Sequence, residues 1–474
     1  MMPRLLPIAL LASIFACAGG VAAGCGSSSA GAGPAPQTDA AAEASPSTGD
    51  AANAADVVEA GAYPAFVPTD IPQVTSRGGP VLALPKVYPI YFAEDDPTFT
   101  AKITDFLSKI GATQYWHATS SEYGVGSLAS GPPIQLTAAD NPPATYSDVD
   151  IETWLSAKLN AGDPAFPPPD GNTIFALFFP TGVTISLGGG GGPPPGDGGT
   201  EGGTEGGIAD AGAPSGSLSC VSFGGYHGAI QLNNNANVAY AVIPRCSNFD
   251  GFGGVDAVTA AVSHELLEGV TDPYSSLGLS AFSSTDSAHR YWATVVGGGG
   301  EIGDMCAQTL SSFTHFPELP AYLVQRCWSN KAALTGGDPC VPVPSGEVYF
   351  NTIPVMPDLL QVMGRGADGG TTTVPTKGVM IALGASKTIE LDLFSNVPTQ
   401  DWTVSAADSS YLNGGSPQLQ FSFDKSSGKN GDKIHLTIKV LATGRRNTEA
   451  FMISSMMGNS PTSPQNIWAG VVGN

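Results

Sequence analysis

Hydrophobic and polar residues follow two different periods along this chain, and the periods divide it into parts. Between residues 63 and 345, strand-like and helix-like runs follow one another. Val87–Phe92, Thr173–Phe179 and Val238–Ile243 are short apolar runs, typical of buried strands. Pro89 lies inside the first run and indicates an edge strand or an irregular start. We therefore expect a β-sheet in this part of the chain.

Three segments between and after these runs have a helical period. Asp96 is a suitable N-cap before Pro97, and apolar residues recur at helical spacing as far as Ile110. Further helices are expected at 150–159 and 255–270. Strands that alternate with helices in this way predict an α+β or α/β domain over residues 63–345.

The last hundred residues change to a period of two, with turn-forming clusters between the runs. Seven such runs stand at Val379–Leu383, Lys387–Phe394, Trp402–Ala406, Leu419–Asp424, Lys433–Val440, Phe451–Ser455 and Ile467–Val472. This pattern predicts an immunoglobulin-like β-sandwich over 371–474. Residues 346–370 are expected to be a linker.

Two low-complexity tracts and a leader complete the organisation. Residues 1–24 combine a basic start with a short apolar stretch, typical of an export signal. Cys25 follows small residues, so we expect it to be lipidated; an ordinary secretory signal is the alternative. Residues 25–62 would be a disordered tether, and 188–217 a Gly-rich insertion in the domain. Gly26 after the cysteine favours anchoring to the outer membrane or cell surface, by analogy with lipoprotein sorting.

The charge of the chain excludes one class of partner. It has 19 Lys and Arg against 41 Asp and Glu, a formal net charge of −22. Such a surface repels a phosphate backbone, which argues against nucleic-acid binding. The 61 Gly and 39 Pro residues favour a loop-rich, exported protein.

The cysteine count fits an oxidising compartment. Seven cysteines are present, and five remain after Cys17 in the leader and Cys25 at the lipid site are set aside. Two disulfides and one thiol are the simplest expectation. The preferred pairs are Cys220–Cys246 and Cys306–Cys340, although spacing alone leaves other pairings open.

The strongest chemical signal is the segment Ser263–Pro273, which reads SHELLEGVTDP. His264 and Glu268 are four residues apart, so on a helix both side chains can reach one ion. Glu265 beside them is placed to activate water, as in the HExxH helix of metalloproteases with Glu in place of the second His. Zn²⁺ accepts both donor types. The alternative is a helix-surface pair of His264 and Glu268.

A later glycine-flanked segment supplies candidates for a third ligand. Glu301 and Asp304 lie three residues apart next to Cys306. We expect Glu301 to be the third ligand, and Asp304 to accept the other imidazole N–H of His264. A capped turn without a metal is the alternative.

These segments resemble the plant EXORDIUM/phosphate-induced protein family and its bacterial relatives. The likeness rests on SHELLEGVTDP, on the later EIGDMC, on Tyr226-His227-Gly228 and on the strand at 238–243, and it covers roughly residues 80–345. It implies an extracellular, wall-associated protein with a helical HExxE segment before an E-I-x-D-x-C segment. It also makes His227 a candidate ligand or stabilising group, although a structural turn histidine is an equal alternative.

Two functions follow from these patterns. The first is a secreted, lipid-anchored zincin-like (metzincin-like) metallohydrolase, most simply a peptidase that uses Zn²⁺. The second is a non-catalytic cell-surface protein that binds a peptide or a cell-wall polymer and has a degenerate metal site. A serine hydrolase is disfavoured because the chain has no GxSxG motif.

Overall fold

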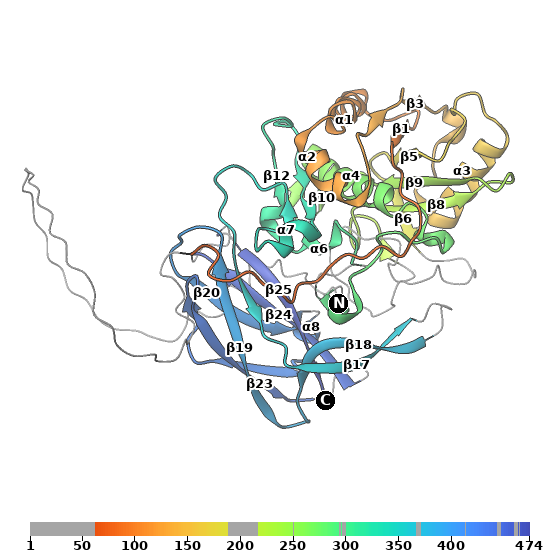
Figure 1. Ribbon diagram of the computed structural model, residues 1–474. Coiled ribbons are helices and arrows are strands. Elements are labelled where there is room, and N and C mark those ends of the chain that lie inside the picture. Colours follow the sequence, from red (N-terminus) through yellow and green to blue (C-terminus); the bar gives the residue numbers. More distant parts are fainter. Residues whose placement is uncertain are drawn as a thin grey trace, which may run out of the picture.

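The computed structural model describes residues 62–187, 217–249, 251–292, 295, 300–365, 371–412, 414–442, 447–458, 463 and 465–474. The expected export signal, the lipidation site Cys25, nearly all of the tether and nearly all of the Gly-rich insertion lie outside these residues. The chain is a mixed α+β protein with several sheets (Figure 1). Among the described residues, no helix is both long and apolar enough to cross a membrane.

A six-stranded mixed sheet forms the centre of the first part. Its strands are β1 (Lys86–Tyr91), β2 (Ala129–Ser130), β3 (Ile134–Gln135), β5 (Thr173–Phe178), β8 (Tyr226–Gln231) and β9 (Asn237–Ile243). The order is β2-β1-β5-β9-β8, with β3 also paired to β1. All pairs are parallel except β8 with β9, which is antiparallel. The three expected strands are therefore present, each within one residue of the expected bounds.

Pro89 does not mark an edge strand, because β1 lies inside the sheet. On one side β1 pairs with β5 along its whole length. On the other side β2 pairs with Lys86 and Val87, and β3 pairs with Ile90 and Tyr91. Pro89 lies at the interruption between β2 and β3, so its missing N–H breaks no continuous ladder.

Helices cover both faces of this sheet. The longer helices are α1 (Pro97–Ile110), α2 (Gln114–Ser120), α3 (Asp148–Asn160) and α4 (Gly254–Thr271). Side chains alternate across β5: Ile174 joins the core that contains α1 and α4, and Phe175 joins the core that contains α3. Asp96 caps α1 as expected, its side chain accepting a hydrogen bond from the Thr98 amide.

Short strands and helices make up the rest of the first part. The small strands are β4 (Thr145–Ser147), β6 (Thr184–Leu187), β7 (Ser217–Leu218), β10 (Asn248–Phe249), β11 (Phe252–Gly253), β12 (Phe313–Thr314), β13 (Val324–Gln325), β14 (Cys327–Trp328) and β15 (Cys340–Val341). The short helices are η2 (Ser121–Tyr123), η3 (Ala138–Asp140), η4 (Ser275–Leu277), η5 (Ser287–His289), α6 (Asp304–Ala307), η6 (Leu310–Ser312) and α7 (Asn330–Leu334).

Two disulfides hold these short elements. Cys220 pairs with Cys246, and Cys306 with Cys340, which matches the expected pairing. Among the described residues, Cys327 is the free cysteine and is buried. Disulfides indicate an extracellular, oxidising environment.

Two further sheets form the C-terminal part. One contains β16 (Phe350–Pro354), β19 (Ser386–Ser395), β23 (Lys433–Val440) and β21 (Leu419–Phe423) in that order. The other contains β17 (Asp358–Arg365), β18 (Thr371–Met380), β25 (Gln465–Gly473), β24 (Thr448–Met456), β20 (Trp402–Asp408) and β22 (Ser427–Gly428), with α8 (Ser409–Leu412) after β20. Six of the seven expected strands are present near their expected bounds, whereas the expected strand Val379–Leu383 overlaps β18 only at Val379 and Met380.

The expected linker at 346–370 contains two strands instead. Phe350–Pro354 pairs with β19, and Asp358–Arg365 pairs with β18. Pro354 and Pro357 give this stretch the appearance of a loop in the sequence. Its strands obtain their hydrogen bonds from partners further along the chain, which local pattern does not reveal.

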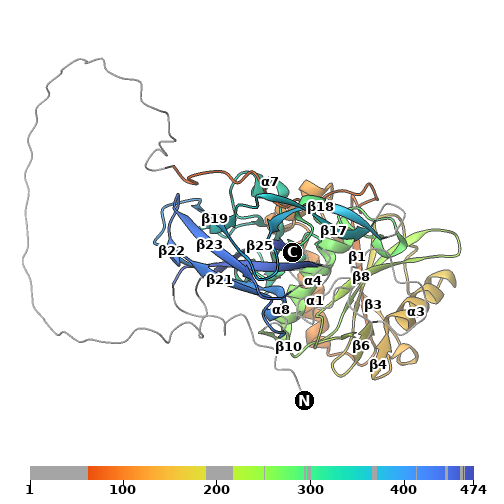
Figure 2. The same cartoon turned by 90° about the horizontal axis from the view of Figure 1, so that it is seen from below.

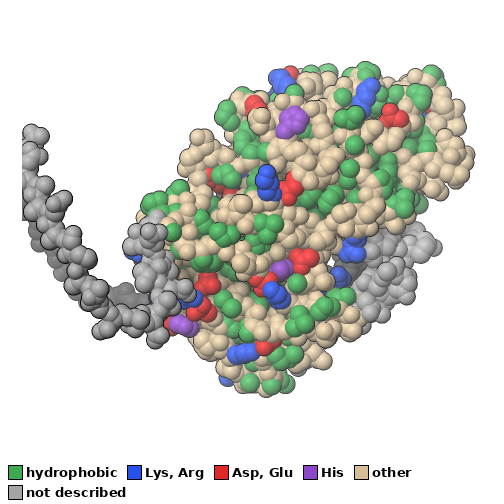
Figure 3. All heavy atoms as spheres, in the orientation of Figure 1, with side chains coloured by type: hydrophobic (Ala, Val, Ile, Leu, Met, Phe, Trp, Pro, Cys, Tyr) green, Lys and Arg blue, Asp and Glu red, His purple; other side chains and the backbone are tan. Residues whose placement is uncertain are grey.

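The two parts of the chain contact each other closely (Figure 2). The Trp292 ring lies 5.9 Å from that of Trp328 in the first part and 4.7 Å from that of Trp468 on β25, measured between centroids. His289 in η5 contacts Asp70 and Asp286, and Lys377 on β18 also contacts Asp70. On the face shown in Figure 3, several acidic and basic side chains lie next to one another.

Candidate metal site

Helix α4 carries the site and is buried on nearly all sides. Every residue from Ala257 to Thr271 is buried, including His264, Glu265 and Glu268, which are 0% exposed. The helix packs against β8, β9 and β13. Small residues such as Ala257 and Ala260 allow this close packing. Three ionisable side chains in such a place require specific polar partners.

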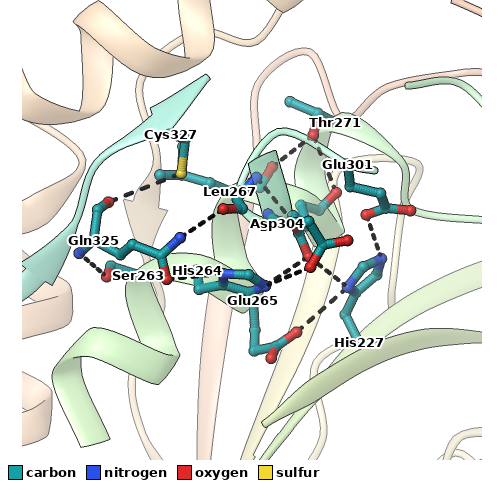
Figure 4. A network of polar contacts seen from close by, with 12 residues as sticks. His227, Ser263, His264, Glu265, Leu267, Thr271, Glu301, Asp304, Gln325 and Cys327 are labelled. Atoms are coloured by element: carbon teal, nitrogen blue, oxygen red, sulfur yellow. Dashed lines mark hydrogen bonds and ion pairs between the residues drawn. The ribbon is translucent and has the colours of Figure 1, made fainter. Parts of the chain in front are cut away.

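His264 is oriented by a glutamine on β13. Its Nδ1 lies 3.0 Å from Gln325 Oε1, and Gln325 Nε2 donates to the Gly303 carbonyl at 2.7 Å. The second bond fixes the amide so that its oxygen faces the imidazole. Nδ1 therefore donates to Gln325 (Figure 4). Nε2 is directed toward Glu268 Oε2, 3.0 Å away. This places Gln325, not Asp304, in the orienting role expected from the sequence.

The two oxygens of Glu268 have different neighbours. Oε1 accepts hydrogen bonds from the backbone N–H groups of Gly303 and Asp304, at 2.9 and 3.0 Å. Oε2 faces His264 Nε2 at 3.0 Å and His227 Nδ1 at 3.9 Å. The backbone bonds thus hold the carboxylate so that one oxygen points between two imidazoles.

The segment at 300–304 places its two carboxylates on different sides of Glu268. Asp304 begins α6, and its Oδ1 lies 3.9 Å from His264 Nε2. Its other oxygen accepts from the Gly300 N–H at 3.1 Å. Glu301 lies next to His227 instead, with Oε2 3.5 Å from Nε2. The expected set of His264, Glu268 and Glu301 is therefore not the one that the turn brings together.

His227 comes from β8 and faces α4. Its Nδ1 lies 3.4 Å from Glu265 Oε2 (Figure 4). Two glycines make room for this contact. A Cβ on Gly225 would come within 2.8 Å of Glu265 Oε1, and one on Gly269 within 3.4 Å of the His227 Cβ. His227 is thus a buried member of the cluster rather than a surface turn residue.

Two groups of donors in this cluster have the spacing of metal ligands. His264, Glu268 and Asp304 form one, and His227, Glu268 and Glu301 form the other; within each, the donor atoms lie within 4.8 Å of one another. Ligands about 2.1 Å from one ion are separated by about 3.0–3.5 Å in tetrahedral or octahedral geometry and by no more than about 4.2 Å. The distances from His264 Nε2 to Glu268 and Asp304, 3.0 and 3.9 Å, and from His227 Nε2 to Glu301, 3.5 Å, fall in this range. The imidazole and carboxylate donors suit zinc and other divalent ions.

A glycine at the centre confirms how tightly the donors are packed. A Cβ at Gly303 would lie 2.7 Å from both Glu268 Oε1 and His264 Nδ1. Any larger residue at position 303 would displace the side chains of Glu268 and His264. The fit is thus specific to the residues present.

Cys327 lies next to the cluster but is not a member of either group. Burial raises the pKa of its thiol well above the usual value, and the negative charges of Glu268 and Asp304 raise it further. The thiol is therefore neutral, and its Sγ contacts the Gln325 carbonyl at 3.8 Å. A neutral thiol is a poor metal ligand and a poor nucleophile.

Arg326, next to Gln325 in the chain, has a structural role. Arg326 separates β13 from β14 and forms ion pairs with Asp338 and Glu347, at 2.9 and 2.7 Å. The orienting role of Gln325 was not anticipated. The available signal was a polar residue inside the apolar run at 322–328, since a buried amide requires hydrogen-bond partners.

Comparisons with known proteins add little to this description. No protein-family model matches the chain, and no curated protein matches it. Among solved structures, the chain is similar to a chimeric titin Z1Z2 functionalized with a KLER exogenous peptide from decorin. That match has 17% identity, covers 20% of this chain and 83% of that chain, and has a TM-score of 0.14. With so low a TM-score, no functional or structural conclusion is drawn from it.

Proposed function

We propose that this chain is an exported, zincin-like metal-dependent hydrolase, most simply a peptidase that uses Zn²⁺. The observation that carries the proposal is the convergence of His264 Nε2, Glu268 and Asp304 as a buried donor group, with a further carboxylate, Glu265, next to them. Glu265 belongs to neither donor group. It is therefore available for proton transfer.

Each side chain has a defined part in this proposal. His264, Glu268 and Asp304 would hold the ion, which when bound supplies a Lewis acid that lowers the pKa of water and polarises a carbonyl. Glu265 would accept the proton from the attacking water and return it to the leaving amine. Its Oε2 lies 3.4 Å from His227 Nδ1, so His227 would position Glu265.

The element order supports a zincin-like core and the likeness to the EXORDIUM family. A strand, a helix and further strands precede the site helix α4, as that core requires. The EIGDMC segment contacts the SHELLEG segment directly, through the Gly303 and Asp304 amides and Glu268. Residues 35 and 36 positions apart in the chain are thus hydrogen-bonded to each other, which supports the joint use of the two motifs.

The proposed location is the cell surface. The two disulfides indicate an oxidising compartment. We propose that Cys25, outside the described residues, is lipidated and anchors the chain to the outer membrane. The substrate would then be an extracellular peptide or a peptide-containing cell-wall polymer.

Metal analysis and hydrolysis assays test the proposal. The purified full chain should contain zinc, and His264→Ala should lose it. Glu265→Gln should keep the metal but lower kcat/KM on a peptide library by roughly 100- to 10,000-fold, the range for loss of a general base. Glu94→Gln, at an exposed site, is the matched control. Hydrolysis by Glu265→Gln at the rate of the natural chain would contradict the proposed role.

Burial favours a second candidate, a non-catalytic binding protein with a structural metal. His264, Glu265 and Glu268 are 0% exposed, and Glu301 is 2% exposed. A catalytic zinc keeps an open position, whereas a structural zinc is enclosed. In this case the chain would hydrolyse nothing, and a chelator would lower its melting temperature. Hydrolysis that stops with the chelator would exclude this candidate.

A further inference from the structure

We propose that the cluster binds two divalent cations, with Glu268 as the ligand that both share. The inference rests on the metal binding of the proposed function and extends it. The first ion would be held by His264, Glu268 and Asp304, and the second by His227, Glu268 and Glu301. The sequence pattern had indicated a single ion.

The geometry separates the two donor groups while joining them at one residue. His264 and Asp304 join Glu268 in the first group, and His227 and Glu301 join it in the second. His264 Nε2 lies 3.0 Å from Glu268 and 3.9 Å from Asp304 in the first group, and His227 Nε2 lies 3.5 Å from Glu301 in the second. Neither group includes a donor of the other except Glu268, so one ion does not account for all five residues.

The position of Glu268 suits a bridging ligand. Its Oε1 is held by the Gly303 and Asp304 amides, and its Oε2 faces both His264 Nε2 and His227 Nδ1. The two imidazoles come from different elements, α4 and β8, and approach the same carboxylate. Carboxylates in this position join metal pairs that lie about 3.5–4 Å apart in hydrolases with two ions.

Charge gives an independent argument for the second ion. The cluster has four carboxylates, Glu265, Glu268, Glu301 and Asp304, all at most 2% exposed. With neutral imidazole ligands these carry a formal charge of −4, and protonation of both imidazoles reduces it only to −2. Buried charge of this size is strongly unfavourable without a counter-charge. Two divalent cations balance the charge of the four carboxylates, whereas a single divalent cation leaves half of that negative charge without a counter-charge.

The second imidazole is oriented in the same way as the first. Glu265 Oε2 lies 3.4 Å from His227 Nδ1, while Nε2 faces Glu301 Oε2 at 3.5 Å. A carboxylate behind one ring nitrogen directs the other toward a metal. Gln325 does the same for His264, so both rings have an orienting partner.

Metal titration of the full chain tests the proposal. Calorimetry with Zn²⁺ on the chelator-treated protein, together with elemental analysis, should give two ions per chain. Asp304→Asn and Glu301→Gln keep the size of each side chain and should each reduce the number to one. Glu268→Gln should weaken both sites. His435→Ala, at an exposed position on β23, is the control and should keep both ions.

Manganese gives a second readout that does not depend on catalysis. Two Mn²⁺ ions that share Glu268 should show an exchange-coupled electron paramagnetic resonance spectrum, which Glu301→Gln should convert to that of an isolated ion. One ion per chain that survives Glu301→Gln and is lost in Asp304→Asn overturns the second site but leaves the proposed function intact. No bound ion in the natural chain overturns both.

Discussion

At the scale of single residues, the hydrogen bond from His264 to Gln325 decides which ring nitrogen faces the carboxylates. Gln325 is itself fixed by the Gly303 carbonyl. An amide does this without adding charge to a cluster that already contains four carboxylates. The orientation of His264 thus depends on a residue 61 positions away in the chain.

Gln325→Leu should weaken zinc binding by about 10- to 100-fold, the usual effect of removing a hydrogen-bond partner of a ligand histidine. The imidazole would lose the partner that holds Nδ1 as the protonated nitrogen. Competition with a chromophoric chelator measures the affinity. Gln361→Leu, the same change at an exposed position on β17, should leave it unaltered. Equal affinities in the two variants would refute this role.

Gly303→Ala should lower the free energy of unfolding by about 1–3 kcal/mol, the typical effect of overpacking. The new Cβ would meet Glu268 Oε1 and His264 Nδ1 at 2.7 Å. The backbone φ of −75° is ordinary, so the effect is steric. Urea denaturation measures the change. Gly171→Ala, where nothing lies within 4 Å of the added atom, is the control; a loss of the same size there would contradict the steric explanation.

The sequence revealed the residues with chemistry but not how they are grouped. His264 and Glu268 could be paired because helical spacing fixes their relation. The expectation that Glu301 completes that pair rests on the glycines before it, which allow the backbone to approach an ion closely. Asp304 lies next to His264 and Glu301 next to His227 because of how the turn at 300–304 and strand β8 are placed. Only the tertiary fold defines that placement.

At the scale of elements, the sequence predicts those helices and strands that are determined by interactions between residues close together in the chain. The N-cap Asp96 and the spacing of apolar residues predict α1. The alternation of apolar and polar residues predicts strands such as β23. Local pattern does not predict β16 and β17, because Pro354 ends the first, Pro357 precedes the second, and their partner strands lie further along the chain. The short elements β13, β14 and α6 have too few residues for a period to appear.

The disulfide Cys306–Cys340 joins α6 to β15, and so holds Asp304 near the site. Replacing both cysteines by alanine should lower the free energy of unfolding by about 3–4 kcal/mol and also weaken zinc binding. The pair Cys220–Cys246, which closes a loop of similar length, is the matched comparison. Its removal should lower the free energy of unfolding, measured by urea denaturation, by a similar amount. It should reduce the zinc affinity less than removal of Cys306–Cys340 does. Equal losses of affinity would contradict the local role of Cys306.

At the scale of the whole molecule, ionic contacts tie three distant segments together. His289 lies 3.0 Å from Asp70 and 2.9 Å from Asp286, and Lys377 on β18 also contacts Asp70. Burial lowers the pKa of His289, but hydrogen bonds and charge interactions with the two carboxylates outweigh it and raise the pKa from 6.5 to about 9. Local pattern does not reveal this cluster, because Asp70 lies 219 positions from His289 and 307 positions from Lys377 in the chain.

This raised pKa predicts how stability depends on pH. The stabilisation by His289 is complete below pH 6.5 and is lost as the pH rises through about 9, because only the folded protein keeps the proton in that interval. The melting temperature of His289→Gln should therefore lie furthest below that of the natural chain near pH 6, and the difference should shrink by pH 10. His117→Gln, whose ring contacts the Ser127 hydroxyl, is the control. A difference that stays constant with pH would refute the assignment.

The contact between the two parts also has an optical consequence. Trp292 stands nearly perpendicular to Trp468, with an interplanar angle of 85°, and also touches Trp328. Indoles this close couple their electronic transitions, which gives a near-ultraviolet circular dichroism signal sensitive to their separation. The chain thus contains an intrinsic spectroscopic reporter of whether the sandwich stays docked when metal is added or withdrawn.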